Sequence, residues 1–89
     1  MPGYDWDPTK GRINLAKHGV AFADAALVLE DPLALTQGDL AVAGEERFVT
    51  LGEDPRKQLL VVVWTPRGER FRLLSARRAT TAERRQYEG

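Results

Sequence analysis

The chain has 89 residues, 43% of them hydrophobic and 29% charged, and its 13 basic and 13 acidic groups give a formal net charge of zero. This composition predicts one globular domain over residues 1–89 and argues against intrinsic disorder. The absence of Cys excludes disulfides and thiolate metal sites, and the single His disfavours a structural zinc site, so we expect a cytoplasmic protein without a metal or cofactor.

No segment predicts membrane association. The longest apolar run, residues 59–64, is far too short to cross a bilayer. The N-terminus has neither the basic region nor the apolar run of a signal peptide.

The first predicted helix covers residues 8–18. Asp7 followed by Pro8 is typical of a helix N-cap and a first helical position. Gly19 stands where a left-handed C-cap residue belongs, so the helix is expected to end before it. Residues 4–6, just before this helix, could form a short edge strand.

A second helix is predicted over residues 21–29, where apolar side chains recur at helical spacing. The remaining pattern predicts four antiparallel strands, at residues 33–37, 46–51, 59–64 and 69–76, joined by a loop at 38–44 and turns at 53–56 and 66–68.

The third of these strands is continuously apolar and β-branched, so we expect it to be central and covered on both faces. Thr80 and Glu83 form a capping box that opens a final short helix. The predicted fold class is therefore α+β. Two N-terminal helices pack on one face of a four-stranded antiparallel sheet, a short C-terminal helix follows, and the other face can be open.

Positive charge concentrates where the last strand meets the last helix. Residues 66–89 carry seven Arg and three Glu, a charge of +4, whereas residues 1–55 carry four basic and ten acidic groups, a charge of −6. Arg77 and Arg78 lie just before the helix N-terminus, whose free backbone N–H groups favour an anion. A guanidinium group binds phosphate through two parallel hydrogen bonds, so we predict an anion site at this junction.

Other charged and aromatic side chains of this region allow two interpretations. Alternation places Arg70 and Arg72 on one face of the last strand together with Ala76. The two arginines can support the anion site, or they can be solvated charges that protect an edge strand. Tyr87 could stack on a base or donate a proton, although packing of the last helix on the sheet explains it as well.

Three further residues could take part in proton transfer or charge neutralisation. His18 is the side chain type suited to proton transfer near neutral pH, although it could equally interact with the end of its helix. Its neighbour Lys17 could be an ordinary solvated residue. Glu46 is the evident carboxylate base near the sheet, with Glu45 as a substitute, and Arg47 must point to the opposite face because the two are neighbours in a strand.

These residues also occur in an order and at distances that resemble a known protein family, the BrnT family of type II toxins. The resemblance covers essentially the whole chain, and its most specific segments are Lys-His-Gly-Val and Ser-Ala-Arg-Arg-Ala-Thr. One departure is Ala21, where relatives often have Ser or Thr, and which removes a helix cap worth roughly 0.5–2 kcal/mol. The matching residues are Trp6-Asp7-Pro8, Lys10, Asn14, Lys17-His18-Gly19-Val20, Phe22, Ala25, Asp31-Pro32, Glu46-Arg47-Phe48, Gly52, the strand at 59–65, residues 74–80, Glu83-Arg84 and Tyr87.

The resemblance implies a RelE-like fold, with helices on one face of an antiparallel sheet and RNA engaged by the other side. It implies a ribonuclease that stops translation and growth. It also implies a BrnA antitoxin with a ribbon-helix-helix part, which forms a heterotetramer with the toxin and represses their promoter. Contact with operator DNA is expected only through that antitoxin.

An RNA substrate supplies its own nucleophile, the 2′-OH, so the hypothetical reaction needs a base, an acid and cations but no metal. The alternative is a binding module without catalysis, which docks RNA or an acidic partner through its Arg cluster. In the catalytic hypothesis three cations contact the phosphate, namely Arg77, Arg47 and Lys17. The acid–base work is shared by Glu46 and His18, in an order that stays open. Three further residues bind RNA, namely Arg72, Arg78 and Tyr87.

Overall fold

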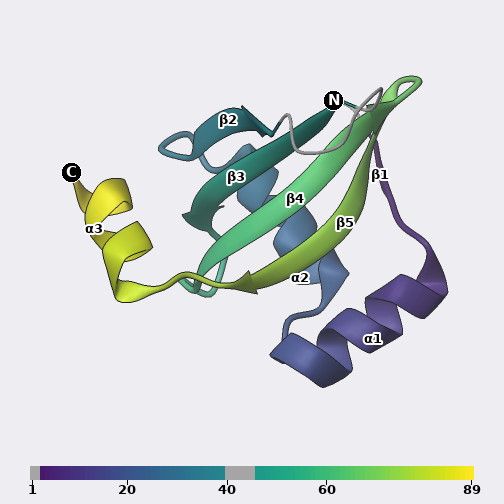
Figure 1. Ribbon diagram of the computed structural model, residues 1–89, viewed down its shortest axis with the longest axis horizontal. Coiled ribbons are helices and arrows are strands. Elements are labelled where there is room, and N and C mark those ends of the chain that lie inside the picture. The colour runs from purple at the N-terminus through teal and green to yellow at the C-terminus, as the bar shows by residue number, and fades with distance from the viewer. Residues whose placement is uncertain (1–2, 40–45) are drawn as a thin grey trace.

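The computed structural model describes residues 3–39 and 46–89 of the chain (Figure 1). Within these residues the strands form one sheet in the order β1-β5-β4-β3-β2, so β4 is central, as predicted. In chain order the elements are β1 (Gly3–Asp5), α1 (Pro8–His18), α2 (Phe22–Ala26), the 3-10 helix η1 (Leu27–Glu30), β2 (Leu35–Asp39), β3 (Arg47–Glu53), β4 (Leu59–Arg67), β5 (Arg70–Arg78) and α3 (Thr81–Glu88). The predicted loop at 38–44 is strand as far as Asp39, and its remainder lies outside the described residues.

The predicted RelE-like architecture, two helices on a four-stranded antiparallel sheet, is wrong. In the described part of the chain the sheet has five strands and is mixed, because β1 joins its edge parallel to β5, with Gly3 opposite Arg70. The second helix is also shorter than predicted. It has five residues, no side-chain cap at Ala21, and continues as the tighter turn η1. A three-residue strand has too little pattern to reveal its partner in the sequence, and an uncapped, Ala-rich helix is readily shortened.

Both ends of α1 form as its sequence predicts. The Asp7 carboxylate accepts a hydrogen bond from the backbone N–H of Thr9 at 2.9 Å, and Pro8 occupies the first turn. Gly19 adopts a left-handed conformation with φ of 69°, and its N–H donates to the Leu15 carbonyl at 2.9 Å. Capping at both ends thus fixes where Lys17 and His18 leave the helix.

Asn14 attaches α1 to the sheet. It is the buried residue of this helix, and its Nδ2 donates to the carbonyl of Ala76 at 2.8 Å and to that of Val20 at 3.0 Å. The N–H of Ala76 donates back to Asn14 Oδ1 at 3.1 Å. The Asn14 amide therefore makes the hydrogen bonds to Ala76 that a neighbouring strand would make, at a position of β5 that β1 does not reach. This places the C-terminal end of α1 beside the end of β5.

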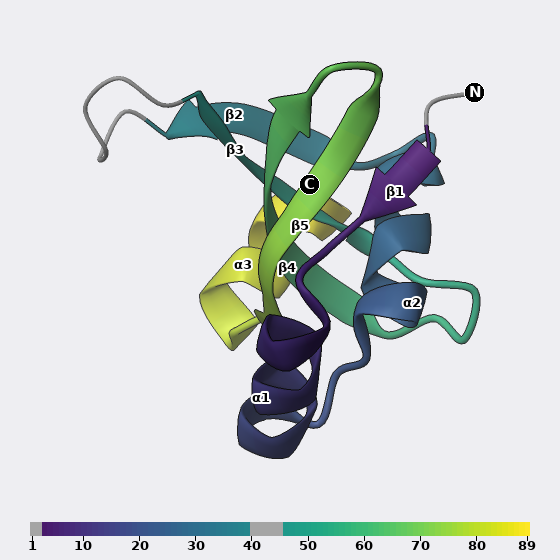
Figure 2. The same ribbon diagram turned by 90° about the vertical axis from the view of Figure 1, so that its right-hand side faces the viewer.

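Apolar side chains pack on both faces of β4. On one face Leu60 and Val62 join a cluster with Phe22 and other residues of α2, η1 and β5. On the other face Leu59 and Val61 form a smaller cluster, against which Tyr87 of α3 packs. Figure 2 shows α2 and α3 on opposite sides of the sheet. We call the α3 side the open face, because α3 covers only part of it.

A β-bulge in β5 changes which of its side chains share a face. Val63 pairs with Ser75 but Trp64 pairs with Leu73, so β5 has one extra residue at this point. The prediction that Arg72 and Ala76 share a face is therefore wrong. Ala76 is buried in the core on the helix side, whereas Arg72 lies opposite Thr65 on the open face.

Candidate functional site

Arg77 lies on the open face, where α3 begins. It pairs with Val61 of β4, and its Nη1 and Nη2 donate to the two carboxylate oxygens of Glu83 at 2.8 and 2.9 Å. Glu83 also accepts from the N–H of Thr80, which completes the predicted capping box. Hydrogen bonds from Arg77 lower the pKa of Glu83 to about 2, and the same bonds raise the pKa of Arg77. The end of β5 and the start of α3 are therefore joined by one charged clamp.

The clamp leaves part of the Arg77 guanidinium available. Glu83 occupies one N–H of Nη1 and one of Nη2, and Nη1 also donates to the carbonyl of Arg78 at 3.2 Å. Within the described residues, no hydrogen bond uses Nε–H or the second N–H of Nη2. These two donors form a second fork that can bind a phosphate, and the side chain is 43% exposed.

Arg78 points to the other side of β5, so the structure does not bring the two predicted guanidinium groups into one site. It pairs with Leu60, which faces the helices, and its Nη2 donates to Gln58 at 3.4 Å. A Cβ at Gly19 would lie 3.6 Å from Arg78 Nη1, which places this guanidinium beside the end of α1. The structure thus brings Arg78 close to the segment that carries Lys17 and His18.

Lys17 and His18 close the last turn of α1. Lys17 is exposed and His18 is half-buried. This end of α1 lies with Arg78 on the helix side of the end of β5, while Arg77 occupies the open face of the same strand end. The end of β5 therefore carries basic side chains on both faces of the sheet, as two separate groups.

Arg47 and Arg72 form a second group, further along the open face. Arg72 pairs with Thr65 of β4, and on the other neighbouring strand Arg47 precedes Phe48, which pairs with Trp64. Their Cα atoms are roughly 10 Å apart, two strand spacings. Arg72 Nη1 lies 3.5 Å from the Asp5 carboxylate, an ion pair that orients it from β1.

Glu46 precedes β3 at this second group and is exposed, and its carbonyl accepts a hydrogen bond from the Thr65 hydroxyl. Thr65 and Val61 are four residues apart on β4, so this group lies roughly 13 Å along the strand from Arg77. Glu46 and Arg47 therefore lie at a separate position on the open face from Arg77. Glu45, the alternative base, lies outside the described residues.

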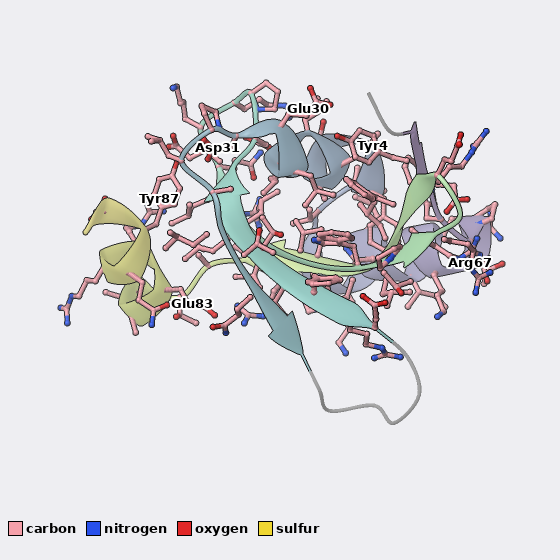
Figure 3. All side chains as sticks on the ribbon, turned by 90° about the horizontal axis from the view of Figure 1, so that it is seen from above. Tyr4, Glu30, Asp31, Arg67, Glu83 and Tyr87 are labelled. Atoms are coloured by element: carbon pink, nitrogen blue, oxygen red, sulfur yellow. The ribbon has the colours of Figure 1, made fainter. Side chains whose placement is uncertain are left out.

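Tyr87 anchors α3 to the sheet. Its hydroxyl donates to Asp31 Oδ2 at 2.6 Å, and Asp31 also accepts from the backbone N–H groups of Glu53 and Leu33 (Figure 3). The hydrogen bond to Asp31 and burial raise the pKa of Tyr87. Burial acts to raise the pKa of Asp31, but the hydrogen bonds that Asp31 accepts outweigh this effect and lower its pKa. Tyr87 thus holds α3 to the sheet, as its predicted packing role requires, through a hydrogen bond to a residue 56 positions away in sequence.

Two residues of this site were missed as functional candidates in the sequence. Glu83 was assigned only to the capping box, although its position six residues after Arg77 allows both contacts. Asn14 carries no charge and gave no signal of its attachment to Ala76. Within residues 3–39 and 46–89, no group of three His, Cys, Asp or Glu side chains is placed to hold a metal ion. The same part of the chain contains no helix with the length and apolarity that a membrane crossing requires.

The family comparison and the structural comparison agree with each other. Residues 6–83 match the family model for the ribonuclease toxin BrnT of type II toxin–antitoxin systems. The crystal structure of the Brucella abortus ribonuclease toxin BrnT is similar to the chain with a TM-score of 0.67 and 26% sequence identity. The match covers 91% of this chain and all of that one. No curated protein sequence matches the chain.

Proposed function

The chain belongs to the BrnT family of ribonuclease toxins of type II toxin–antitoxin systems, and from this premise we propose that it cleaves RNA at the end of β5. One observation supports this location. Arg77 presents two free donors on the open face, while on the other side of the same strand end Arg78 lies beside Gly19, the residue that follows Lys17 and His18. Among the described residues, this is where cations and a His come together.

The proposed reaction uses the 2′-OH of the RNA as nucleophile. A base takes the proton of this hydroxyl, O2′ attacks the adjacent phosphorus, and the bond from phosphorus to O5′ breaks. An acid gives a proton to the leaving O5′. The products are a 2′,3′-cyclic phosphate and a 5′-hydroxyl end. Because the nucleophile belongs to the substrate and guanidinium groups offset the phosphorane charge, we propose that no metal ion is required.

Geometry separates the candidate residues into two roles. We assign the phosphate at the cleavage position to Arg77, and we propose that RNA passing around the end of β5 meets Lys17, Arg78 and the proton-transfer group His18 on the helix side. Arg47 and Arg72, roughly 13 Å away on the open face, would bind the RNA backbone next to the cleavage position. Glu46 lies at that second group, so we assign proton transfer at the end of β5 to His18, whose helix ends beside Arg78.

We further propose that the protein acts in the cytoplasm, inhibits translation and growth, and is neutralised by a BrnA-like antitoxin with a ribbon-helix-helix part. The family assignment supports an antitoxin partner, because a type II toxin is controlled by a protein. The strong Arg excess of residues 66–89 suits either RNA or an acidic segment of such a partner. Operator DNA would be contacted through the antitoxin alone.

The test is incubation of the purified protein with RNA in the presence of EDTA, followed by analysis of the new ends. We expect cleavage with 2′,3′-cyclic phosphate ends, and we expect His18→Ala to slow it by about 10²- to 10⁴-fold, the usual range for one acid–base group. Cleavage that stops in EDTA would refute metal independence. Binding with intact RNA would instead support a binding module without catalysis.

A further inference from the structure

A groove runs across the open face beside the Arg77–Glu83 clamp. Its volume is about 390 Å³, within the usual range for pockets that bind small molecules. Val49, Leu51 and Val61 of β3 and β4 form its floor. Gln37 of β2 and Gln86 of α3 stand on its rim. The groove therefore combines an apolar floor with two amide side chains that come from opposite sides.

This combination fits one nucleobase better than it fits an apolar protein segment. Leu51 and Val61 are 7% and 5% exposed, so they are held in the packed sheet and offer an apolar surface to the face of a ring. Each carboxamide offers both donors and acceptors, as the edge of a base does. Proteins that select RNA sequences commonly take an unstacked base out of a single strand and bond its edge in this way.

The position of the groove connects it to the phosphate site. Glu83 lines the groove and also holds Arg77, whose second fork of donors stays available. A phosphate bound by that fork would bring the base of an adjoining nucleotide to the groove. The segment 66–89, which contains Arg77 and the lining residues Glu83 and Gln86, carries seven Arg and three Glu, which favours an anionic strand over a neutral apolar peptide.

We propose that this groove is a subsite for one nucleobase of the RNA substrate, read by Gln37 and Gln86. The proposal rests on the ribonuclease function proposed above and adds a source of sequence preference to it. A matched pair of bonds between a carboxamide and a base edge discriminates between bases by roughly 1–3 kcal/mol, which corresponds to about fivefold to a hundredfold. The wild-type protein should show a preference of this size at one nucleotide next to the bound phosphate.

The test compares Gln37→Leu and Gln86→Leu, singly and together, with Arg56→Leu as a control. Arg56 lies on the turn after β3, pairs with Asp24 at 3.1 Å and is not a lining residue of the groove. Cleavage rates are measured on RNAs that differ at one nucleotide. In a second arm, fluorescence anisotropy gives the affinity for the same RNAs made uncleavable by a 2′-deoxy substitution at the cleavage position.

The proposal predicts that both leucine variants reduce the base preference at one position by at least fivefold in affinity, whereas Arg56→Leu leaves it unchanged. An unchanged preference in the double variant, or no preference in the wild type, would overturn it. Loss of antitoxin binding with an intact base preference would identify the groove as a protein-docking surface and also overturn it. Absence of cleavage with an intact base preference in the binding arm would refute the ribonuclease function and leave the base subsite supported.

Discussion

The clamp between Arg77 and Glu83 should contribute to the stability of the fold by an amount that depends on pH. Glu83→Gln removes the negative charge but keeps a side chain of the same shape, which can still accept hydrogen bonds and can still serve in a capping box. The substitution therefore isolates the charged part of the interaction from the cap. Glu88→Gln, at an exposed position of the same helix, is the matched control.

The magnitude follows from the pKa of Glu83, which hydrogen bonds from Arg77 lower from 4.5 to about 2. A full shift of this size is equivalent to roughly 3 kcal/mol at pH 7. The Arg77 side chain is 43% exposed and that of Glu83 26%, so solvent screening reduces the contribution to about 1–1.5 kcal/mol. Because the folded-state pKa is lowered, this stability is present above pH 4.5 and is lost as the pH falls through about 2.

The assay is urea denaturation of the wild type, Glu83→Gln and Glu88→Gln at pH 7 and at pH 3. At pH 7 we expect Glu83→Gln to lower the free energy of unfolding by about 1–1.5 kcal/mol. At pH 3 the difference should shrink to less than half of that value. A loss of the same size at both pH values would show that the charged clamp does not stabilise the fold.

Three other substitutions test the contacts that position the site. Asn14→Ala leaves buried backbone groups of Ala76 without partners, so urea denaturation should show a loss of about 2–4 kcal/mol, and a loss below 1 kcal/mol would contradict the attachment of α1. Tyr87→Phe should accelerate amide hydrogen exchange in α3 but not in β4, and unchanged exchange in α3 would show that its hydroxyl does not hold the helix. Gly52→Ala places a Cβ 3.0 Å from two side-chain carbons and should lower the free energy of unfolding by about 1–3 kcal/mol. The control Gly38→Ala meets open space and should leave the free energy of unfolding nearly unchanged. Equal effects of the two substitutions would refute the close packing at Gly52.

Local patterns predicted the elements that carry their own signals. Asp7 and Gly19 marked the ends of α1, and Thr80 with Glu83 marked the start of α3, because caps act over a few residues. The apolar run of β4 predicted its central place. Strand ends were less accurate. The strand predicted at 46–51 extends to Glu53, and Gly52 lies inside it, where its missing side chain makes room for η1 and the following turn.

Long-range features could not be predicted, since they depend on contacts between distant segments. The bulge in β5 reverses the alternation that grouped Arg72 with Ala76. Arg77 and Arg78 are neighbours in sequence, yet strand geometry turns them to opposite faces and separates the predicted pair. The bond from Tyr87 to Asp31 and the parallel pairing of β1 likewise join segments with no common pattern in the sequence.

The central claim is that Arg77 binds the phosphate at which RNA is cleaved. The most direct measurement compares RNA cleavage rates, in EDTA, of the wild type, Arg77→Ala and the control Arg67→Ala, an exposed arginine near the opposite end of β4. Removal of a cation that stabilises the transition state should slow cleavage by about 10²- to 10³-fold in Arg77→Ala, with circular dichroism showing a folded protein, and the control should retain its rate. Cleavage by folded Arg77→Ala at the wild-type rate would contradict the account.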